Sequence, residues 1–372
     1  MFGQSSTPEA GIAAPGFTSS PALPEYFPAL DGLRAVCVAM VMSNHIPAGI
    51  VRPRWMYGWL GVDVFFVLSG FLITILLIRE RGRTGGISLR GFYVRRFCRI
   101  VPLYLCTVLL YDVAVHATGD AGKIAQFGHA LPWLLTFMEE YRPAAAGDLM
   151  GHAWTLGIEE KFYLVWPVAL IGLLPLGRRS LLGLGLSCVV VLGLGEPFSR
   201  AYGGLLIGAL AAFGLSSPAC RSAVEWLQAL PEWCRGALVL AAYAAGGANA
   251  ALLPLFSLSL ALSLPSLATD AGRLTRLLAN PVLVYIGRRS YGMYLIHVLA
   301  MNLVGRCVPF PVPGRWYVVL PLGYAASLAG AALLHVLIER PCIDYGRALV
   351  RRFPAPRPVA ARPEALTEPH TT

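Results

Sequence analysis

The stretch "WLGVDVFFVLSGFLITILLI", residues 59–78, decides the fold class of this chain. Its twenty residues carry one charged side chain, that of Asp63. An α-helix of this length and composition can cross the hydrocarbon layer of a membrane. We therefore interpret residues 59–78 as a membrane span, and the rest of the chain contains further segments of the same kind.

The composition of the 372-residue chain extends this interpretation to the whole molecule. Hydrophobic residues make up 56% and charged residues 13%, and the mean hydropathy is +0.62. Apolar runs of about spanning length predict an all-α, polytopic transmembrane helical bundle of about ten spans. The runs lie at 33–50, 59–78, 100–118, 161–176, 180–195, 202–215, 235–250, 252–268, 290–305 and 316–338. A further run at 129–138, "HALPWLLTFM", is short and contains Pro132, so we expect a re-entrant or interfacial segment.

The positive charges predict the orientation of the spans. The loop "RERGRTGGISLRGFYVRRFCR" at 79–99 is rich in arginine and is therefore expected in the cytoplasm. Both termini then lie inside and residues 119–158 outside, with Arg52 and Arg54 as exceptions. The formal net charge of +10 comes from arginines between apolar runs, so topology explains it better than nucleic-acid binding does. This predicts a multi-pass membrane protein, which we expect in the cytoplasmic membrane of a bacterium.

The chain divides into three parts by composition. Residues 1–25, rich in small residues and proline, are expected to be disordered, and 26–345 form the membrane domain. Residues 346–372 form a basic, Pro-rich cytoplasmic tail. About 30 residues follow the last expected span, so we expect a stand-alone membrane domain.

Few ionisable residues fall inside the expected spans, and each needs a reason to be there. Arg34 and His45 are eleven residues apart, close to three helical turns, and therefore share one face of the first span. An interfacial arginine and a core histidine would account for them without any function.

Two adjacent glutamates stand near the expected start of the fourth span, in "HAWTLGIEEKFYLVWP" at 152–167. We expect the helix to begin at Glu159 and Glu160, where the N-terminal dipole favours carboxylates, and this accounts for Glu160. The predicted topology puts Glu159 on the same side of the membrane as His45. A carboxylate beside an imidazole allows the imidazole to act as a general base, which suits activation of an alcohol.

Five segments together resemble one known family. They are "LDGLRAVCVAMVMSNH" (30–45), "GVDVFFVLSGFLIT" (61–74), "FYVRRFCRIVPLY" (92–104), "HAWTLGIEEKFYLVWP" (152–167) and "SYGMYLIH" (290–297). In this order they resemble the acyltransferase 3 family of integral membrane O-acyltransferases, over residues 26 to 345.

The resemblance implies roles for the residues that match the family's motifs. Its Arg-x10-His motif falls on Arg34 and His45, and its Arg-x-x-Arg motif on Arg96 and Arg99. Its Ser-Leu-x-x-Glu-x-x-Phe-Tyr signature falls on Thr155, Leu156, Glu159, Phe162 and Tyr163, with Thr in place of Ser.

The implied reaction moves an acyl group, most often acetyl, from cytoplasmic acyl-coenzyme A to a hydroxyl, without a metal ion. His45 and Glu159 are the implied catalytic residues. Arg96 and Arg99, backed by Arg90 and Arg95, offer guanidinium groups to the coenzyme phosphates.

Other polar residues have weaker claims. Asp63 matches a family acid and either orients His45, binds the acceptor, or is an interfacial aspartate. Ser290, Tyr294 and His297 share one helix face and either line the coenzyme channel or bond neighbouring helices. His152 and Trp154 precede the glutamate motif and are candidates for the acceptor entrance. His335 and Glu339, four residues apart, are expected to form a structural pair.

The acceptor expected from the resemblance is a carbohydrate such as a surface polysaccharide. The alternative acceptors are a lipid or an antibiotic-type natural product. A transporter or flippase would show internal repeats with broken helices, and the sequence contains none. A lipid-modifying acyltransferase of another superfamily would use a membrane histidine with an asparagine, and Asn44 precedes His45. That class does not explain Arg96, Arg99 and Glu159.

Overall fold

The computed structural model describes residues 26–47, 53, 56–143, 149–194, 198–269, 272–308 and 316–353, and within these ranges it is helical without strands. Short 3-10 turns join some of the α-helices. The α-helices are α1 (Pro28–Asn44), α2 (Gly61–Thr84), α3 (Leu89–His116), α4 (Ala121–Leu135), α5 (Trp154–Leu173), α6 (Arg178–Leu192), α7 (Phe198–Ser216), α8 (Arg221–Ala229), α9 (Glu232–Ala248), α10 (Leu253–Thr269), α11 (Arg273–Leu278), α12 (Pro281–Arg288), α13 (Ser290–Cys307), α14 (Trp316–Leu334) and α15 (Arg340–Val350).

The all-helical class predicted from the sequence is confirmed, and each of the ten predicted spans overlaps one of these helices. Among the described residues, five helical segments are long and apolar enough to cross a membrane. They are Gly58–Thr84, Leu89–His116, Phe198–Ser216, Ala250–Thr269 and Trp316–Val350. The number of crossings and their direction stay predictions.

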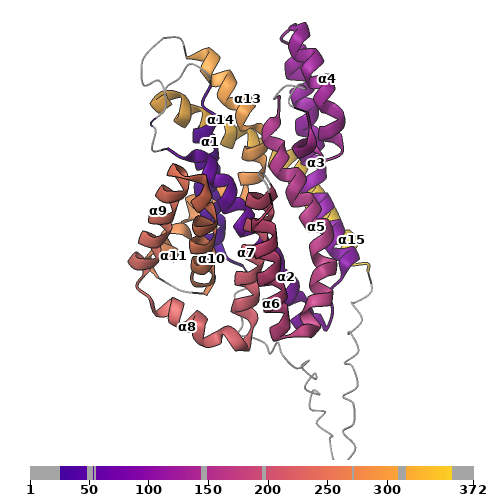
Figure 1. Ribbon diagram of the computed structural model, residues 1–372. Helices are drawn as coiled ribbons and strands as arrows, with labels where there is room; N and C mark the ends of the chain where they lie inside the picture. The colour runs from indigo at the N-terminus through magenta and orange to yellow at the C-terminus, as the bar shows by residue number, and fades with distance from the viewer. Residues whose placement is uncertain are drawn as a thin grey trace, which may run out of the picture.

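The helices pack closely where glycines remove the side chain. A Cβ on Gly70 of α2 would lie 1.9 Å from the carbonyl oxygen of Leu205, and one on Gly208 of α7 would lie 2.0 Å from that of Val67. The backbones of α2 and α7 therefore touch, as small residues allow in membrane bundles. In Figure 1, α9 and α10 lie on one side of α2 and α7, and α3 and α5 on the other.

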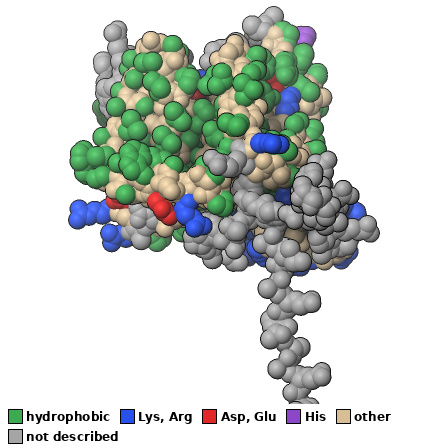
Figure 2. Space-filling view, turned by 60° about the horizontal axis from the view of Figure 1, so that its bottom comes forward, with side chains coloured by type: hydrophobic (Ala, Val, Ile, Leu, Met, Phe, Trp, Pro, Cys, Tyr) green, Lys and Arg blue, Asp and Glu red, His purple; other side chains and the backbone are tan. Residues whose placement is uncertain are grey.

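The outer surface of the bundle is apolar. Leu109, Leu164, Leu182 and Leu240 are each more than 60% exposed. Figure 2 shows hydrophobic side chains over much of the face in view and Lys and Arg side chains along its lower edge. Large exposed apolar surface of this extent fits contact with lipid.

The short apolar run at 129–138 belongs to α4, which starts earlier than the run does. Asp120 caps this helix by accepting hydrogen bonds from the backbone N–H groups of Gly122 and Lys123. Tyr104 of α3 donates to the carbonyl of Leu134 over 3.0 Å. Figure 1 shows α4 beside one end of α3, so the run forms part of a helical hairpin.

The C-terminal helices pass through a π-helical turn at His335–Glu339. His335 Nδ1 lies 2.8 Å from the carboxylate of Glu339, so the predicted structural pair is confirmed. The next helix, α15, packs on α3 and runs to Val350, across the predicted start of the tail at residue 346. The predicted disordered segment 1–25 and residues 354–372 lie outside the described residues.

Candidate active site

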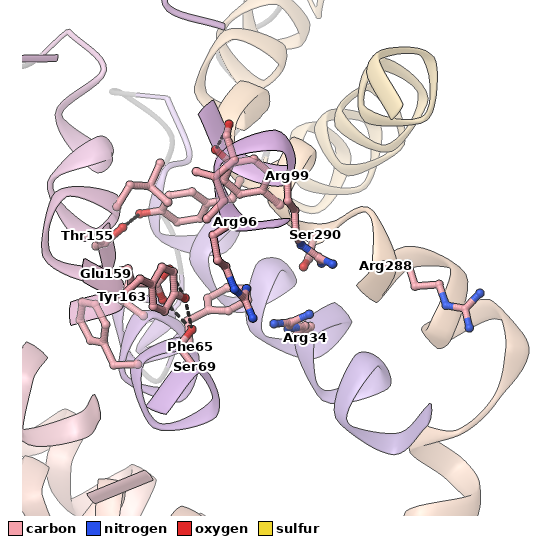
Figure 3. A pocket seen from close by; sticks show the side chains of 16 residues that line it. Arg34, Phe65, Ser69, Arg96, Arg99, Thr155, Glu159, Tyr163, Arg288 and Ser290 are labelled. Carbon is pink, nitrogen blue, oxygen red and sulfur yellow. Dashed lines mark hydrogen bonds between the residues drawn. The ribbon is translucent and has the colours of Figure 1, made fainter. Parts of the chain in front are cut away.

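A cavity of about 690 Å³, partly open to solvent, lies between α1, α2, α3, α5 and the α12–α13 junction. It gathers seven of the site residues predicted from the sequence, and Figure 3 labels most of them. These seven are Arg34, Arg96, Arg99, Thr155, Glu159, Tyr163 and Tyr294. Three other candidates, His45, Asp63 and His297, do not line it.

Three arginines line one side of the cavity. Arg34 comes from α1, and Arg96 and Arg99 come from α3, one helical turn apart. The Arg96 guanidinium lies 5.2 Å from the centre of the Tyr163 ring, and Arg34 lies 3.7 Å from Asp31. Three cations around one cavity favour an anion within it, and guanidinium groups suit phosphate oxygens.

Arg90 and Arg95, which were expected to support Arg96 and Arg99, do not line the cavity, whereas Arg288 does. Arg95 pairs with Glu80 at 2.9 Å, and Arg90 lies 4.3 Å from the ring centre of Phe353. Their support of coenzyme binding stays a prediction. Arg288, at the end of α12, lines the cavity and is 56% exposed. The sequence analysis missed it, because no apolar span or motif contains it.

Glu159 lies on the opposite side of the cavity in a triangle of hydrogen bonds. Its carboxylate accepts from Ser69 Oγ at 2.8 Å and from the Tyr163 hydroxyl at 3.2 Å. The Tyr163 hydroxyl also lies 3.1 Å from Ser69 Oγ, so its one proton is shared between Glu159 and Ser69. Figure 3 shows these bonds between α5 and α2. The partner Ser69 carried no prediction, because only the packing of α2 against α5 brings it to Glu159.

The start of α5 differs from the expectation. This helix begins at Trp154 after a 3-10 turn at Gly151–Ala153, and no side chain caps it. Glu160 therefore lies in the second turn of α5, and the prediction that it marks the helix start is wrong. Successive residues on a helix point about 100° apart, so only Glu159 of the two reaches the cavity.

A hydrogen-bonded link leads away from the cavity towards His152. The Tyr294 hydroxyl donates to the carbonyl of His152 at 2.7 Å. Its oxygen lies 2.6 Å from Thr155 Oγ1. Thr155 Oγ1 lies 3.3 Å from the same carbonyl, and each hydroxyl has one proton, so either of them can be the donor in that second bond. The threonine that replaces the family's serine keeps a hydroxyl at this position.

Three histidine rings gather beyond that link. The centroid of the His297 ring lies 4.7 Å from that of His45 and 4.8 Å from that of His152, and His45 and His152 are 6.1 Å apart. We call these three rings the imidazole cluster. His45 comes from the end of α1, His297 from α13 and His152 from the turn before α5. The sequence placed His45 and His297 in the site separately and placed His152 only near an entrance.

The predicted pairing of His45 with Glu159 is absent from the structure. The Glu159 carboxylate bonds Ser69 and Tyr163, whereas Nδ1 of His45 lies 2.9 Å from the carbonyl of Val41. His152, which lies in the imidazole cluster, precedes Glu159 by seven residues, or roughly 10 Å of helix rise. The two proposed catalytic groups therefore occupy neighbouring regions, joined through Thr155 and Tyr294.

Comparison with known proteins identifies the family. A model described as an acyltransferase domain matches residues 27–339. The chain belongs to the acyltransferase 3 family. Two of its curated relatives are named for peptidoglycan: OatA of Listeria monocytogenes is called a peptidoglycan O-acetyltransferase, and YrhL of Bacillus subtilis a putative one.

The similarity to these relatives covers most of this chain. OatA is 28% identical over 369 residues, which is 87% of this chain and 56% of the relative. YrhL is 30% identical over 366 residues, 88% of this chain and 56% of the relative. A putative O-acetyltransferase of Staphylococcus aureus is 28% identical over 332 residues, 78% of this chain and 53% of the relative. The chain thus spans about half the length of these relatives, and no solved structure matches it.

Asp63 has an ion-pair partner that the sequence analysis missed. Its carboxylate, 1% exposed, receives two hydrogen bonds of 2.6 Å from the Arg200 guanidinium of α7. Arg200 also lies 4.5 Å from the centre of the Trp59 ring. A buried bidentate pair of this kind fixes α2 against α7. None of the sequence alternatives for Asp63 included it, because Arg200 is 137 residues away along the chain.

Proposed function

We propose that this chain is a multi-pass membrane O-acetyltransferase that moves an acetyl group from cytoplasmic acetyl-coenzyme A to a hydroxyl of a carbohydrate-type acceptor, such as a surface polysaccharide. The observation that carries the proposal is the arginine-lined cavity, joined through Thr155 and Tyr294 to the imidazole cluster. The family match and the names of the relatives support the acetyl group and the glycan acceptor.

The proposed topology has ten spans and both termini in the cytoplasm, in the cytoplasmic membrane of a bacterium. The arginine-rich loop between α2 and α3 supports this direction. Arg34, near the start of α1, and Arg96 and Arg99, near the start of α3, then open towards the cytoplasm. His45, at the other end of α1, lies towards the external side.

The donor is proposed to enter with its phosphates on the arginines. Arg96, Arg99 and Arg34 offer guanidinium groups inside the cavity, and the exposed Arg288 meets the incoming coenzyme at the cavity mouth. The flexible pantetheine arm then reaches past Glu159 and Tyr294 towards His45. The thioester arrives beside the imidazole cluster, where the acceptor hydroxyl meets it.

His45 is the proposed general base. Since the carbonyl of Val41 only accepts, Nδ1 of His45 carries the proton of that hydrogen bond, and Nε2 keeps the lone pair. Nε2 takes the proton of the acceptor hydroxyl as its oxygen attacks the thioester carbon. Glu159 is proposed to act within the cavity, where it balances the nearby charge of Arg96 and Arg34 and fixes the hydroxyls of Ser69 and Tyr163.

The test is transfer from labelled acetyl-coenzyme A by the purified protein in detergent. We expect the label on an added glycan acceptor, or slow release of acetate when no acceptor is present. A transporter would give neither product, and that result with folded protein would refute the proposal. Mass spectrometry of surface glycans from strains with and without the gene then identifies the acceptor, and a loss of acetyl confined to lipids would remove the glycan from the proposal.

A further inference from the structure

One polar atom of the imidazole cluster, Nε2 of His297, has no role in the proposed function. His297 is fully buried, at 0% exposure, and within the described residues its Nε2 has no hydrogen-bond partner. The other nitrogen of this ring, Nδ1, lies 2.6 Å from the carbonyl of Tyr294 on the same helix. A buried polar atom without a partner is costly, so its retention calls for an explanation.

The backbone carbonyls around the cluster determine where its protons lie. A carbonyl oxygen only accepts, so the nitrogen beside it must carry hydrogen. Val41 fixes the proton of His45 on Nδ1, and Tyr294 fixes that of His297 on Nδ1. The carbonyl of Leu295 lies 3.2 Å from Nε2 of His152 and fixes its proton there.

In the neutral cluster, therefore, all three N–H groups donate to the backbone. Nε2 of His297 carries a lone pair, and neither neighbouring ring has a hydrogen left to donate to it. This changes when His45 takes up a second proton, because its Nε2 then becomes a donor. The ring centres of His45 and His297 are 4.7 Å apart and the planes are inclined by 79°, so the two rings are in contact.

We propose that His297 is a positioning residue whose Nε2 accepts a hydrogen bond from the imidazolium of His45. The inference rests on the proposed function. The O–H bond of the acceptor breaks as an N–H bond forms at Nε2 of His45, and the acceptor oxygen bonds the thioester carbon. When the C–S bond breaks, the proton leaves His45 for the coenzyme thiolate. Between these two events the single Nε2–H of His45 is shared, in a three-centre hydrogen bond, between the reacting oxygen or sulfur and Nε2 of His297. His297 thus holds the protonated ring, a part that the sequence had given to Glu159.

The surroundings of the cluster support an imidazole as the partner. Among the described residues, the rings that approach His297 are those of His45, His152 and Tyr294. The phenol of Tyr111 lies 6.1 Å from His152 between ring centres. Of these groups the imidazoles are the ones that can take up a second proton and then donate to Nε2 of His297.

The test compares two amide variants of the full-length protein in detergent. In His297→Gln the side-chain amide reaches the position of Nε2 and its oxygen restores an acceptor there. In His297→Asn the amide reaches only the position of Nδ1, so the acceptor at Nε2 is lost. We expect kcat of His297→Asn to fall roughly tenfold to a hundredfold, the usual effect of one hydrogen bond to a charged group, with both KM values unchanged. His297→Gln should recover most of that loss.

Three outcomes overturn the proposal. Equal loss in both variants with a lower unfolding temperature means that His297 only packs the helices. A rise in KM for the acceptor means that Nε2 binds substrate directly, and unchanged kcat in both means that it has no part in turnover. The wild-type protein is assayed first, because absence of transfer there refutes the proposed function and not the role of His297.

Discussion

Replacing Glu159 by glutamine, with Glu160→Gln as the matched control, separates the two adjacent carboxylates. Glutamine keeps the shape of the side chain and one acceptor oxygen but removes the negative charge. Glu159 accepts hydrogen bonds from Ser69 and Tyr163, and bonds to a charged acceptor are about twice as strong as neutral ones. A loss of ~1 kcal/mol in each gives about 2 kcal/mol, or roughly thirtyfold in kcat.

The same substitution should not weaken donor binding. The cavity holds Arg34, Arg96 and Arg99, and removing a carboxylate from beside them leaves more positive charge for an anion. We therefore expect KM for acetyl-coenzyme A to stay level or fall in Glu159→Gln while kcat drops. Glu160 does not line the cavity, so Glu160→Gln should keep kcat within about twofold of the wild type.

The assay is initial-rate transfer of labelled acetyl by purified variants at matched concentration, with the unfolding temperature recorded for each. Equal losses in the two variants, or a larger loss at Glu160, would refute the assignment of Glu159 to the cavity. A large rise in KM for acetyl-coenzyme A in Glu159→Gln would refute the charge argument even if kcat falls as expected.

Three further predictions concern the donor site and the helix packing. Replacing Arg96 and Arg99 by lysine keeps the positive charge and loses the forked geometry of the guanidinium group. KM for acetyl-coenzyme A should therefore rise about tenfold while KM for the acceptor stays constant. A rise confined to KM for the acceptor would exclude donor binding by these arginines. Arg288→Ala should raise the same KM only about threefold, because this arginine is 56% exposed, and an unchanged value would remove it from the donor path. Gly208→Ala should lower the free energy of unfolding by about 1–3 kcal/mol, because the new methyl group clashes with the backbone of α2. Gly214→Ala on the same helix meets no atom within 4 Å and should leave the unfolding temperature unchanged. Equal effects of the two substitutions would contradict the packing of α7 on α2.

The sequence predicted the helices and much of the cavity for a physical reason. Long apolar runs leave the backbone no alternative to the helix in a membrane, and residues spaced along one helix lie on a known face. Helix spacing placed Glu159 with Tyr163 on one face of α5. Arg96 and Arg99 came from the family resemblance, which set them in the loop at 79–99, whereas α3 begins at Leu89 and includes both. The structure brings all four to one cavity.

Contacts between helices could not be predicted in the same way. Ser69 meets Glu159 across 90 residues, and Asp63 meets Arg200 across 137. Spacing on a single helix says which side a residue faces and not which helix covers it. The sequence therefore assigned Glu159 to His45, whereas the rings that approach His45 are His297 and His152.

The N-terminus of α5 was misplaced for a local reason. The residue before this helix is Ala153, and no side chain caps the first turn, so the usual signal of a helix start is absent. The glutamates were the strongest acidic signal nearby, and a prediction based on the helix dipole therefore began the helix too late.

Acetyl transfer by His45→Ala, measured beside the wild type with labelled acetyl-coenzyme A and a glycan acceptor, tests the central claim most directly. The wild-type protein should form the acetylated product. His45→Ala should keep the wild-type unfolding temperature and KM for the donor, and it should lose roughly a hundredfold or more in rate, as expected when a positioned general base is removed. Transfer by the folded variant at a rate near that of the wild type would contradict the account.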